Sequence, residues 1–182
     1  MAKYGTNGID DFVGTIFADE IFALGGDDTF HGSPGADTLH GGAGLDSVDY
    51  SSFGSQVSPL PGPFAGGAVD VDLQRAVQSG GLADGDVLIL IENVGGSRDD
   101  DTIRGTGGVN ILVGLGGDDL IEGRGGPRCA SPKGPGSRIS GAPRRPSGMS
   151  GARRPGALHR IRDTRVARME CRRNAANPFD RL

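Results

Sequence analysis

The sequence has few of the residues that build a conventional globular core. It contains no tryptophan, aromatic residues make up only 5% of the chain, and no apolar run reaches the roughly 18 residues of a membrane-spanning helix. The N-terminus lacks the basic and then apolar pattern of a secretory signal peptide. The motifs H-E-x-x-H and G-x-S-x-G are absent, and no glycine run matches a nucleotide-binding loop. These absences predict a chain with no membrane span and no catalytic site.

Glycine, by contrast, accounts for 34 residues and recurs with a period of nine between Gly5 and Asp49. Five units follow one another without a break: GTNGIDDFV, GTIFADEIF, ALGGDDTFH, GSPGADTLH and GGAGLDSVD. Aspartate always occupies position 6 of the unit: Asp10, Asp19, Asp28, Asp37 and Asp46. An apolar residue always occupies position 8: Phe12, Ile21, Phe30, Leu39 and Val48. Two columns without exception indicate a structural repeat.

The composition of the unit predicts how it folds. Positions 1 to 6 favour a turn, because glycine allows the positive φ angles that tight turns use. Positions 7 to 9 predict a short strand whose central residue points to one side and its neighbours to the other. Turn and strand in alternation predict a solenoid in which two units complete one coil and position 8 faces inward. Aspartates 18 residues apart, such as Asp10 and Asp28, are then expected to stack about 4.8 Å apart.

Stacked carboxylates repel one another, so the pattern predicts a counter-cation. Ca²⁺ suits it, since this ion accepts carboxylate and backbone carbonyl oxygens together. The units resemble the G-G-x-G-x-D-x-U-x nonapeptide of hemolysin-type (RTX, repeats-in-toxin) proteins, a calcium-binding β-helix repeat. The resemblance covers residues 5–126 with an interruption. It implies an all-β fold, a parallel β-roll (β-solenoid) with Ca²⁺ between stacked turns, in a protein exported by Gram-negative bacteria.

Residues 50–95 interrupt the repeats after a first block at residues 1–49. The proline-rich start of this insert predicts a loop, and the alternation of apolar and polar residues over 68–73 predicts a half-buried strand. Residues 87–95 can be aligned as one more unit, with Glu92 at position 6 and an apolar residue at position 8. The insert is therefore expected to continue the roll.

A second block of units occupies residues 96–126: GSRDDDTIR, GTGGVNILV and GLGGDDLIE. Its position 6 holds Asp101, Asn110 and Asp119, and its position 8 is again apolar. A fourth unit begins at Gly123 but has Arg128 where the aspartate is expected, so the pattern stops within a repeat.

Residues 127–182 differ from the rest in charge. Their net charge is +11, whereas residues 1–126 carry −15. The pairs Arg144-Arg145 and Arg153-Arg154 lie nine residues apart, which suggests repeat-coding DNA translated in another reading frame. The alternative is an evolved basic tail for nucleic acid or anionic membranes. We favour a frame shift or truncation after residue 126, and we expect a disordered tail and no nucleic-acid partner.

Each ion is expected to take one carboxylate from each of two turns one coil apart, together with backbone carbonyls. The predicted ligands are Asp10, Asp19, Asp28, Asp37, Asp46, Asp101 and Asp119, with Asp10 on Asp28, Asp28 on Asp46, Asp19 on Asp37 and Asp101 on Asp119. The Asp28 and Asp46 turns are expected to bind best because both keep glycine at position 4, which Phe17 replaces in the Asp19 turn. Neutral Asn110, stacked on Glu92, is expected to bind poorly. Alternatively, the aspartates only cap their turns by accepting backbone N–H groups.

The histidines and cysteines give weaker signals. His31 and His40 both occupy position 9 of consecutive units, which places them on opposite sides of the roll and argues against a zinc site. Cys129 and Cys171 lie in the tail, and two cysteines alone do not define a disulfide.

These patterns predict a secreted, non-catalytic calcium-binding module that folds when Ca²⁺ binds. Its expected partners are calcium ions and, by the resemblance, a type I secretion apparatus. The basic C-terminus departs from the secretion signals usual in that family. Two alternatives stay open: the detached C-terminal roll of a secreted protease, lipase or toxin, or an adhesin or surface module.

Overall fold

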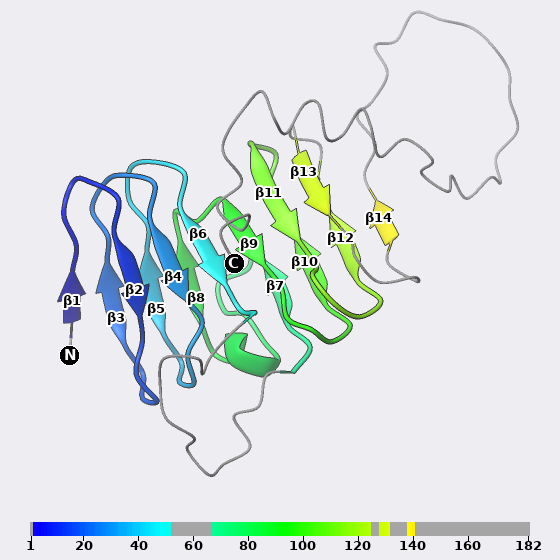
Figure 1. The fold of residues 1–182 in the computed structure, drawn as a ribbon, viewed down its shortest axis with the longest axis horizontal. Helices are drawn as coiled ribbons and strands as arrows, with labels where there is room; N and C mark the ends of the chain where they lie inside the picture. The colour runs from blue at the N-terminus through cyan, green and yellow to red at the C-terminus, as the bar shows by residue number, and fades with distance from the viewer. Residues whose placement is uncertain (1, 52–66, 125–127, 132–137, 141–182) are drawn as a thin grey trace, which may run out of the picture.

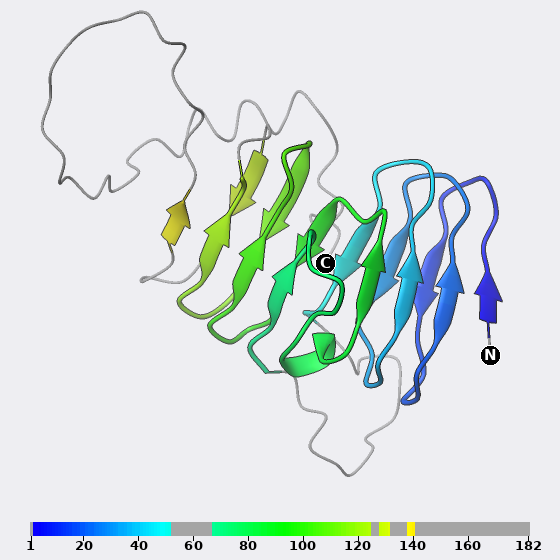
Figure 2. The same ribbon diagram turned by 180° about the vertical axis from the view of Figure 1, so that it is seen from behind.

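The computed structural model describes residues 2–51, 67–124, 128–131 and 138–140. Short strands alternate with turns and wind the chain into a flattened coil (Figures 1 and 2). The strands are β1 (Ala2–Tyr4), β2 (Asp11–Val13), β3 (Glu20–Phe22), β4 (Thr29–His31), β5 (Thr38–His40), β6 (Ser47–Asp49), β7 (Asp70–Asp72), β8 (Val87–Ile89), β9 (Asn93–Gly95), β10 (Thr102–Arg104), β11 (Asn110–Val113), β12 (Leu120–Glu122), β13 (Arg128–Ser131) and β14 (Arg138–Ser140). One 3-10 turn, η1 (Gly81–Ala83), lies between β7 and β8. Within these ranges, no helix is long and apolar enough to cross a membrane.

Each coil contributes one strand to each of two faces. One face is a six-stranded sheet in the order β13-β11-β9-β6-β4-β2, and the other is divided into β1-β3-β5-β8 and β14-β12-β10-β7. All these strand pairs are parallel, and Phe12 lies opposite Phe30, which lies opposite Val48. Partners thus lie 18 residues apart, as two nine-residue units per coil require. The predicted parallel β-roll is confirmed.

Position 8 of the unit forms the core. The side chains at this position point between the two faces and are buried at Ile21, Phe30, Leu39, Val48, Ile103, Leu112 and Ile121. Phe12 is only partly buried, at the N-terminal end, where it stacks on Phe30 with ring centroids 5.2 Å apart. Each strand thus contributes one large apolar side chain, and burial of each contributes roughly 1.5–3 kcal/mol.

The insert contributes strands to both faces. β8 pairs with β5, so that Leu88 lies opposite Leu39, and β9 pairs with β6. Glu92 and Val94 take positions 6 and 8 of the repeat unit, as predicted. The predicted start of that unit at Val87 is wrong, because Val87 begins β8 and belongs to the preceding unit. Leu90, in a left-handed conformation with φ 54°, lets the chain turn back within three residues.

Two further strands continue the ladders past residue 126, where the sequence predicted that the roll stops. β13 pairs with β11, and β14 pairs with β12. Parallel pairing uses backbone groups, so it does not require the aspartate that Arg128 replaces. The remainder of the predicted tail, including Cys171 and the paired arginines, lies outside the described residues.

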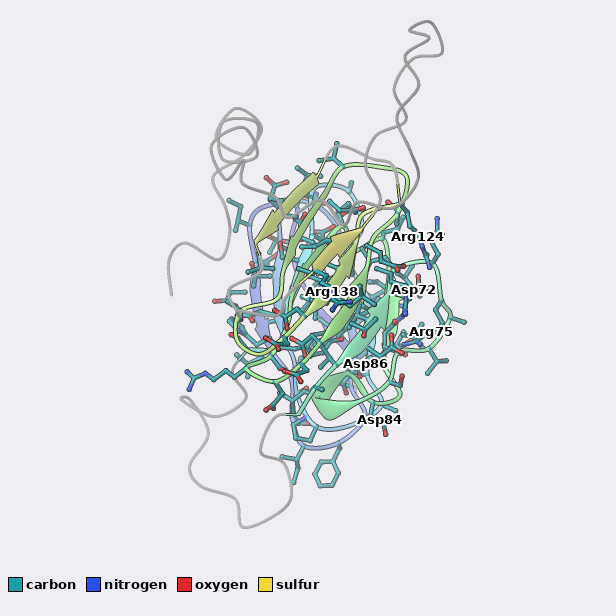
Figure 3. All side chains as sticks on the ribbon, turned by 90° about the vertical axis from the view of Figure 1, so that its right-hand side faces the viewer. Asp72, Arg75, Asp84, Asp86, Arg124 and Arg138 are labelled. Carbon is teal, nitrogen blue, oxygen red and sulfur yellow. The ribbon has the colours of Figure 1, made fainter. Side chains whose placement is uncertain are left out.

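Arginines link carboxylates across the second half of the roll. Arg124 donates hydrogen bonds to both carboxylate oxygens of Asp72, at 2.6 and 2.5 Å, and Figure 3 shows these two side chains and Arg75 on one side of the molecule. Arg104 contacts Asp70 at 2.9 Å and Glu122 at 3.3 Å. Burial raises the pKa of Asp72, but the hydrogen bonds from Arg124 and the Gln74 N–H, together with the positive charges of Arg124 and Arg104, outweigh it and hold that pKa below its usual value. Protein cations therefore neutralise acidic strands in this half.

Candidate metal centre

The roll stacks its position-6 residues in columns at the two edges of the coil. One column contains Asp10, Asp28, Asp46, Glu92 and Asn110, and the other contains Asp19, Asp37 and Asp86 in the first half and Asp101 and Asp119 in the second. The backbone N–H of Asp10 donates to Oδ1 of Asp28 at 2.7 Å, and that of Asp28 donates to Oδ1 of Asp46 at 2.9 Å. The same bond joins Asp19 to Asp37 at 2.9 Å.

All seven predicted ligands therefore stand in the stacks that the repeat register predicts. In the second block, the Asp101 N–H donates to Oδ1 of Asp119 at 3.2 Å. Asn110 donates from its side-chain amide to the Glu92 carbonyl oxygen, so this pair stacks without bringing two carboxylates together. Whether an ion bridges each stack stays a prediction.

Asp86 occupies position 6 of a unit that the sequence analysis missed. Its Oδ1 accepts the Asp37 N–H at 2.9 Å, and its Oδ2 accepts the hydroxyl of Tyr50 at 2.8 Å. The signal that would have located it is the segment Asp86-Val87-Leu88-Ile89, an aspartate two residues before an apolar residue that is partly buried, without the preceding glycines. The structure thus adds a third carboxylate to the column of Asp19 and Asp37.

One kind of turn satisfies its own aspartate. Serine or threonine stands at position 2, its backbone N–H donates to the position-6 side chain, and its hydroxyl accepts the N–H of position 4. In the first unit the Thr6 N–H lies 2.6 Å from Oδ2 of Asp10, and the Gly8 N–H lies 3.1 Å from the Thr6 hydroxyl. The same bonds occur in the turns of Thr15, Ser97 and Thr106. Such a turn is ordered by its own side chains.

A second kind of turn has a different backbone conformation at position 2. Position 2 is left-handed in three turns, at Leu24 (φ 77°), Gly42 (φ 106°) and Leu115 (φ 67°). In the first two, the position-6 side chains of Asp28 and Asp46 are 1% and 0% exposed. Neither Oδ2 atom has a hydrogen-bond partner among the described residues. A buried carboxylate oxygen without a partner costs free energy that a cation would recover.

Backbone carbonyl oxygens lie between these same two turns. A Cβ at Gly42 would lie 2.3 Å from the carbonyl oxygen of Leu24, and a Cβ at Gly44 would lie 2.0 Å from that of Gly26. Glycine is required at both positions, since φ is positive and a side chain would collide with backbone. The turns thus bring two carboxylates and backbone carbonyls together, the oxygen set that Ca²⁺ accepts.

Burial raises the pKa values of the carboxyls at this edge. Burial is the largest cause for both Asp28 and Asp46, and the charges of neighbouring carboxylates, Asp10 beside Asp28 and Asp28 and Glu92 beside Asp46, add to it. The pKa of Asp46 rises to about 6. A divalent cation between the turns would favour the ionised forms, because it would replace repulsion with attraction.

Zinc-type ligation does not fit the side chains at hand. In the described parts of the chain, no group of three or more His, Cys, Asp or Glu side chains converges on one point. His31 contacts Asp11 at 2.7 Å, and His40 stacks on Phe22 with ring centroids 4.2 Å apart, in a different sheet. An ion held by the turns would therefore take two carboxylates and complete its shell with backbone oxygens, as Ca²⁺ does.

The fold and the site together define a parallel β-roll whose acidic turns suit a hard divalent cation. The family model for the RTX calcium-binding nonapeptide repeat (4 copies) matches residues 4–39, 22–52 and 95–127. The chain carries hemolysin-type RTX repeats, and RTX nonapeptide repeats bind Ca²⁺. No curated protein matches the sequence.

Acid is expected to stabilise the ion-free roll. The pKa values of Asp46 and Asp86 are raised from 3.8 to about 6 and about 7 in the folded chain. Between about pH 4 and pH 7 the folded state therefore binds more protons than the unfolded state. The contribution is full below the unfolded pKa and is lost as pH rises through the folded values. With EDTA present, far-UV circular dichroism should show more β signal at about pH 5 than at about pH 8, because the lower pH favours the folded state by on the order of 2 kcal/mol.

A β signal in EDTA that stays constant or increases from about pH 5 to about pH 8 would contradict the burial of these carboxyls. Saturating Ca²⁺ serves as the control, because a bound cation removes the advantage of protonation and should reduce or reverse the pH dependence.

Proposed function

We propose that the protein is a calcium-binding module in which Ca²⁺ between the stacked turns drives the roll to fold. The observation that carries the proposal is the pair of buried carboxylate oxygens of Asp28 and Asp46, which no protein donor satisfies within the described residues. Without a cation these turns hold two like charges in a buried place. Since the turns are ordered only in the folded chain, the free energy of ion binding becomes free energy of folding.

The turns of Asp28 and Asp46 form the strongest site. Both have left-handed residues at positions 2 and 4, and Leu24 and Gly26 present carbonyl oxygens toward the next turn. The turn before Asp119 has the same left-handed backbone conformation at position 2, where Leu115 stands. We assign the ion in the first block to two carboxylates and the backbone oxygens around them.

The setting we propose for this module is extracellular. Calcium modules outside cells typically bind at roughly 10⁻⁴ to 10⁻³ M, so such a chain stays loose inside a cell and folds after export. Export through a type I secretion apparatus suits a chain that is unfolded at low Ca²⁺. The module acts by binding and folding and catalyses no reaction of its own.

Far-UV circular dichroism of the full chain tests the proposal. After EDTA treatment, Ca²⁺ is added stepwise, and Mg²⁺ is added to a parallel sample. We expect a cooperative gain of β signal with a midpoint of roughly 10⁻⁴ to 10⁻³ M for Ca²⁺. Mg²⁺ should have little effect at the same concentrations, because it demands a tighter octahedral shell and dehydrates reluctantly. A β spectrum that is complete in EDTA and indifferent to Ca²⁺ would overturn ion-driven folding.

A further inference from the structure

We infer that Ser33 and Tyr50 take the place of calcium at one edge of the first block, so that Ca²⁺ binds only at the opposite edge. This edge carries Asp19, Asp37 and Asp86. The inference rests on the proposed function, since it concerns which turns of a calcium-binding roll accept the ion.

Ser33 lies between the turns of Asp19 and Asp37. Its side chain is buried, and its hydroxyl donates to Oδ2 of Asp37 at 2.7 Å. A Cβ on Gly14 would lie 1.9 Å from Oγ of Ser33 and 3.3 Å from Oδ2 of Asp19. The serine therefore covers Gly14 of the preceding coil, beside the Asp19 carboxylate, and occupies the space between the two turns.

One coil further along, Tyr50 also donates a hydroxyl to a carboxylate and fills the space beside a turn. Its hydroxyl donates to Oδ2 of Asp86 at 2.8 Å, and its ring packs against Gly32, where a Cβ would lie 2.4 Å from the ring. Tyr50 is 1% exposed and Asp86 is 0% exposed, so this hydrogen bond is made out of water. The aromatic ring occupies the space beside the Asp37 turn, and the phenol oxygen satisfies the next carboxylate.

All three carboxylates of this edge thus receive a hydroxyl from the chain. Asp19 accepts the Thr15 hydroxyl at 2.8 Å, in addition to the serine and tyrosine contacts of its neighbours. Hydrogen bonds to charged groups are stronger than those between neutral groups. They satisfy the oxygens that an ion would otherwise bind, and their donors leave no space for it.

At the opposite edge the Thr6 hydroxyl donates to Oδ2 of Asp10 at 2.9 Å in the first unit, but the next two turns have no such donor. Leu24 and Gly42 stand where Ser33 stands, and neither side chain carries a hydroxyl. Their left-handed backbone leaves Oδ2 of Asp28 and of Asp46 without a partner within the described residues. Beyond the first unit, the two edges of the same block therefore differ in what satisfies their carboxylates: hydroxyl groups at one, and a cation at the other.

Isothermal titration of the full chain with Ca²⁺ tests the inference through the number of ions bound. Ser33→Gly removes both the hydroxyl and the atoms that cover Gly14, and it places at position 2 the residue that the next unit carries there as Gly42. We expect the Ser33→Gly variant to bind one more Ca²⁺ per chain than the unmodified protein. Thr38→Ala, which removes a hydroxyl from strand β5 of the same unit, is the matched control and should bind the unmodified number.

An unchanged number of ions in Ser33→Gly would overturn the inference, whereas absence of Ca²⁺ binding in the unmodified protein would overturn the proposed function instead. If Ser33→Gly does not fold, hydrogen exchange of the unmodified protein decides. With EDTA present, amides of Asp19 and Asp37 should be protected at least tenfold more than those of Asp28 and Asp46, and Ca²⁺ should remove most of that difference. Equal protection at both edges in EDTA would contradict the assignment.

Discussion

Replacing Asp46 with asparagine is expected to weaken the calcium response and to make the ion-free roll easier to fold. The amide oxygen can still accept the Asp28 N–H, which lies 2.9 Å from Oδ1 in the present chain. The other oxygen becomes an NH₂ group that cannot bind a cation. The substitution also removes a charge that repels Asp28 and Glu92 in a buried place. Asp46→Asn is therefore expected to destabilise the Ca²⁺-bound roll and to stabilise the ion-free roll.

Calcium titration followed by circular dichroism measures the first effect, and the β signal that remains in EDTA measures the second. We expect the Ca²⁺ midpoint of Asp46→Asn to rise at least roughly tenfold, which corresponds to about 1.4 kcal/mol or more of lost binding. Asp11→Asn is the control, since it makes the same charge change at an exposed strand position and should leave the midpoint within about twofold. An unchanged midpoint in Asp46→Asn would show that Asp46 is not a ligand.

Leu112→Ala is expected to cost more stability than any surface change in the molecule. Leu112 is fully buried in β11, whose neighbours in the six-stranded sheet are β9 and β13. Truncation of a buried leucine typically costs about 2–5 kcal/mol, as lost transfer free energy and as the cavity left behind. Ile111 and Val113 beside it are also buried but lie outside the central core cluster, so little neighbouring core can collapse into the space.

Urea denaturation of the Ca²⁺-saturated protein gives the free energy of unfolding for this comparison. Val109→Ala, in the turn before the same strand, removes an exposed apolar side chain and should change stability by less than about 0.5 kcal/mol. Equal effects of the two substitutions would mean that position 8 does not form the core.

The repeat register could be predicted from the sequence because two columns repeat every nine residues. That period places Phe12, Phe30 and Val48 in one ladder without any knowledge of long-range contacts. It also stacks Asp28 on Asp46, since a coil of two units brings residues 18 apart together. The pattern encodes this part of the fold locally, which makes it accessible to inspection.

The contacts across the insert could not be predicted in this way. Asp86 accepts a hydrogen bond from Asp37, 49 residues earlier, and the hydroxyl of Tyr50, 36 residues earlier. The intervening loop has no fixed period, so its length does not determine which coil Asp86 joins. The sequence also does not reveal that the turn at Leu90 is shorter than the turns of the repeat, so that Val87 belongs to the preceding unit.

The difference between the turns was also hidden in the sequence. Leu24 and Leu115 adopt positive φ although leucine rarely does so, and only the coils stacked on them impose that conformation. The serine and threonine residues at position 2 could have been identified as turn caps, since short hydroxyl side chains commonly bond to nearby backbone. What the sequence does not reveal is that Ser33 reaches across to the preceding coil at Gly14.

A crystal structure of the full chain grown with Ca²⁺, with anomalous scattering to locate the ion, tests the central claim most directly. We predict an anomalous peak about 2.3–2.6 Å from carboxylate oxygens of both Asp28 and Asp46, with backbone carbonyl oxygens completing its shell. Density for an ion between Asp19 and Asp37, and none between Asp28 and Asp46, would contradict both the proposed site and the role of Ser33.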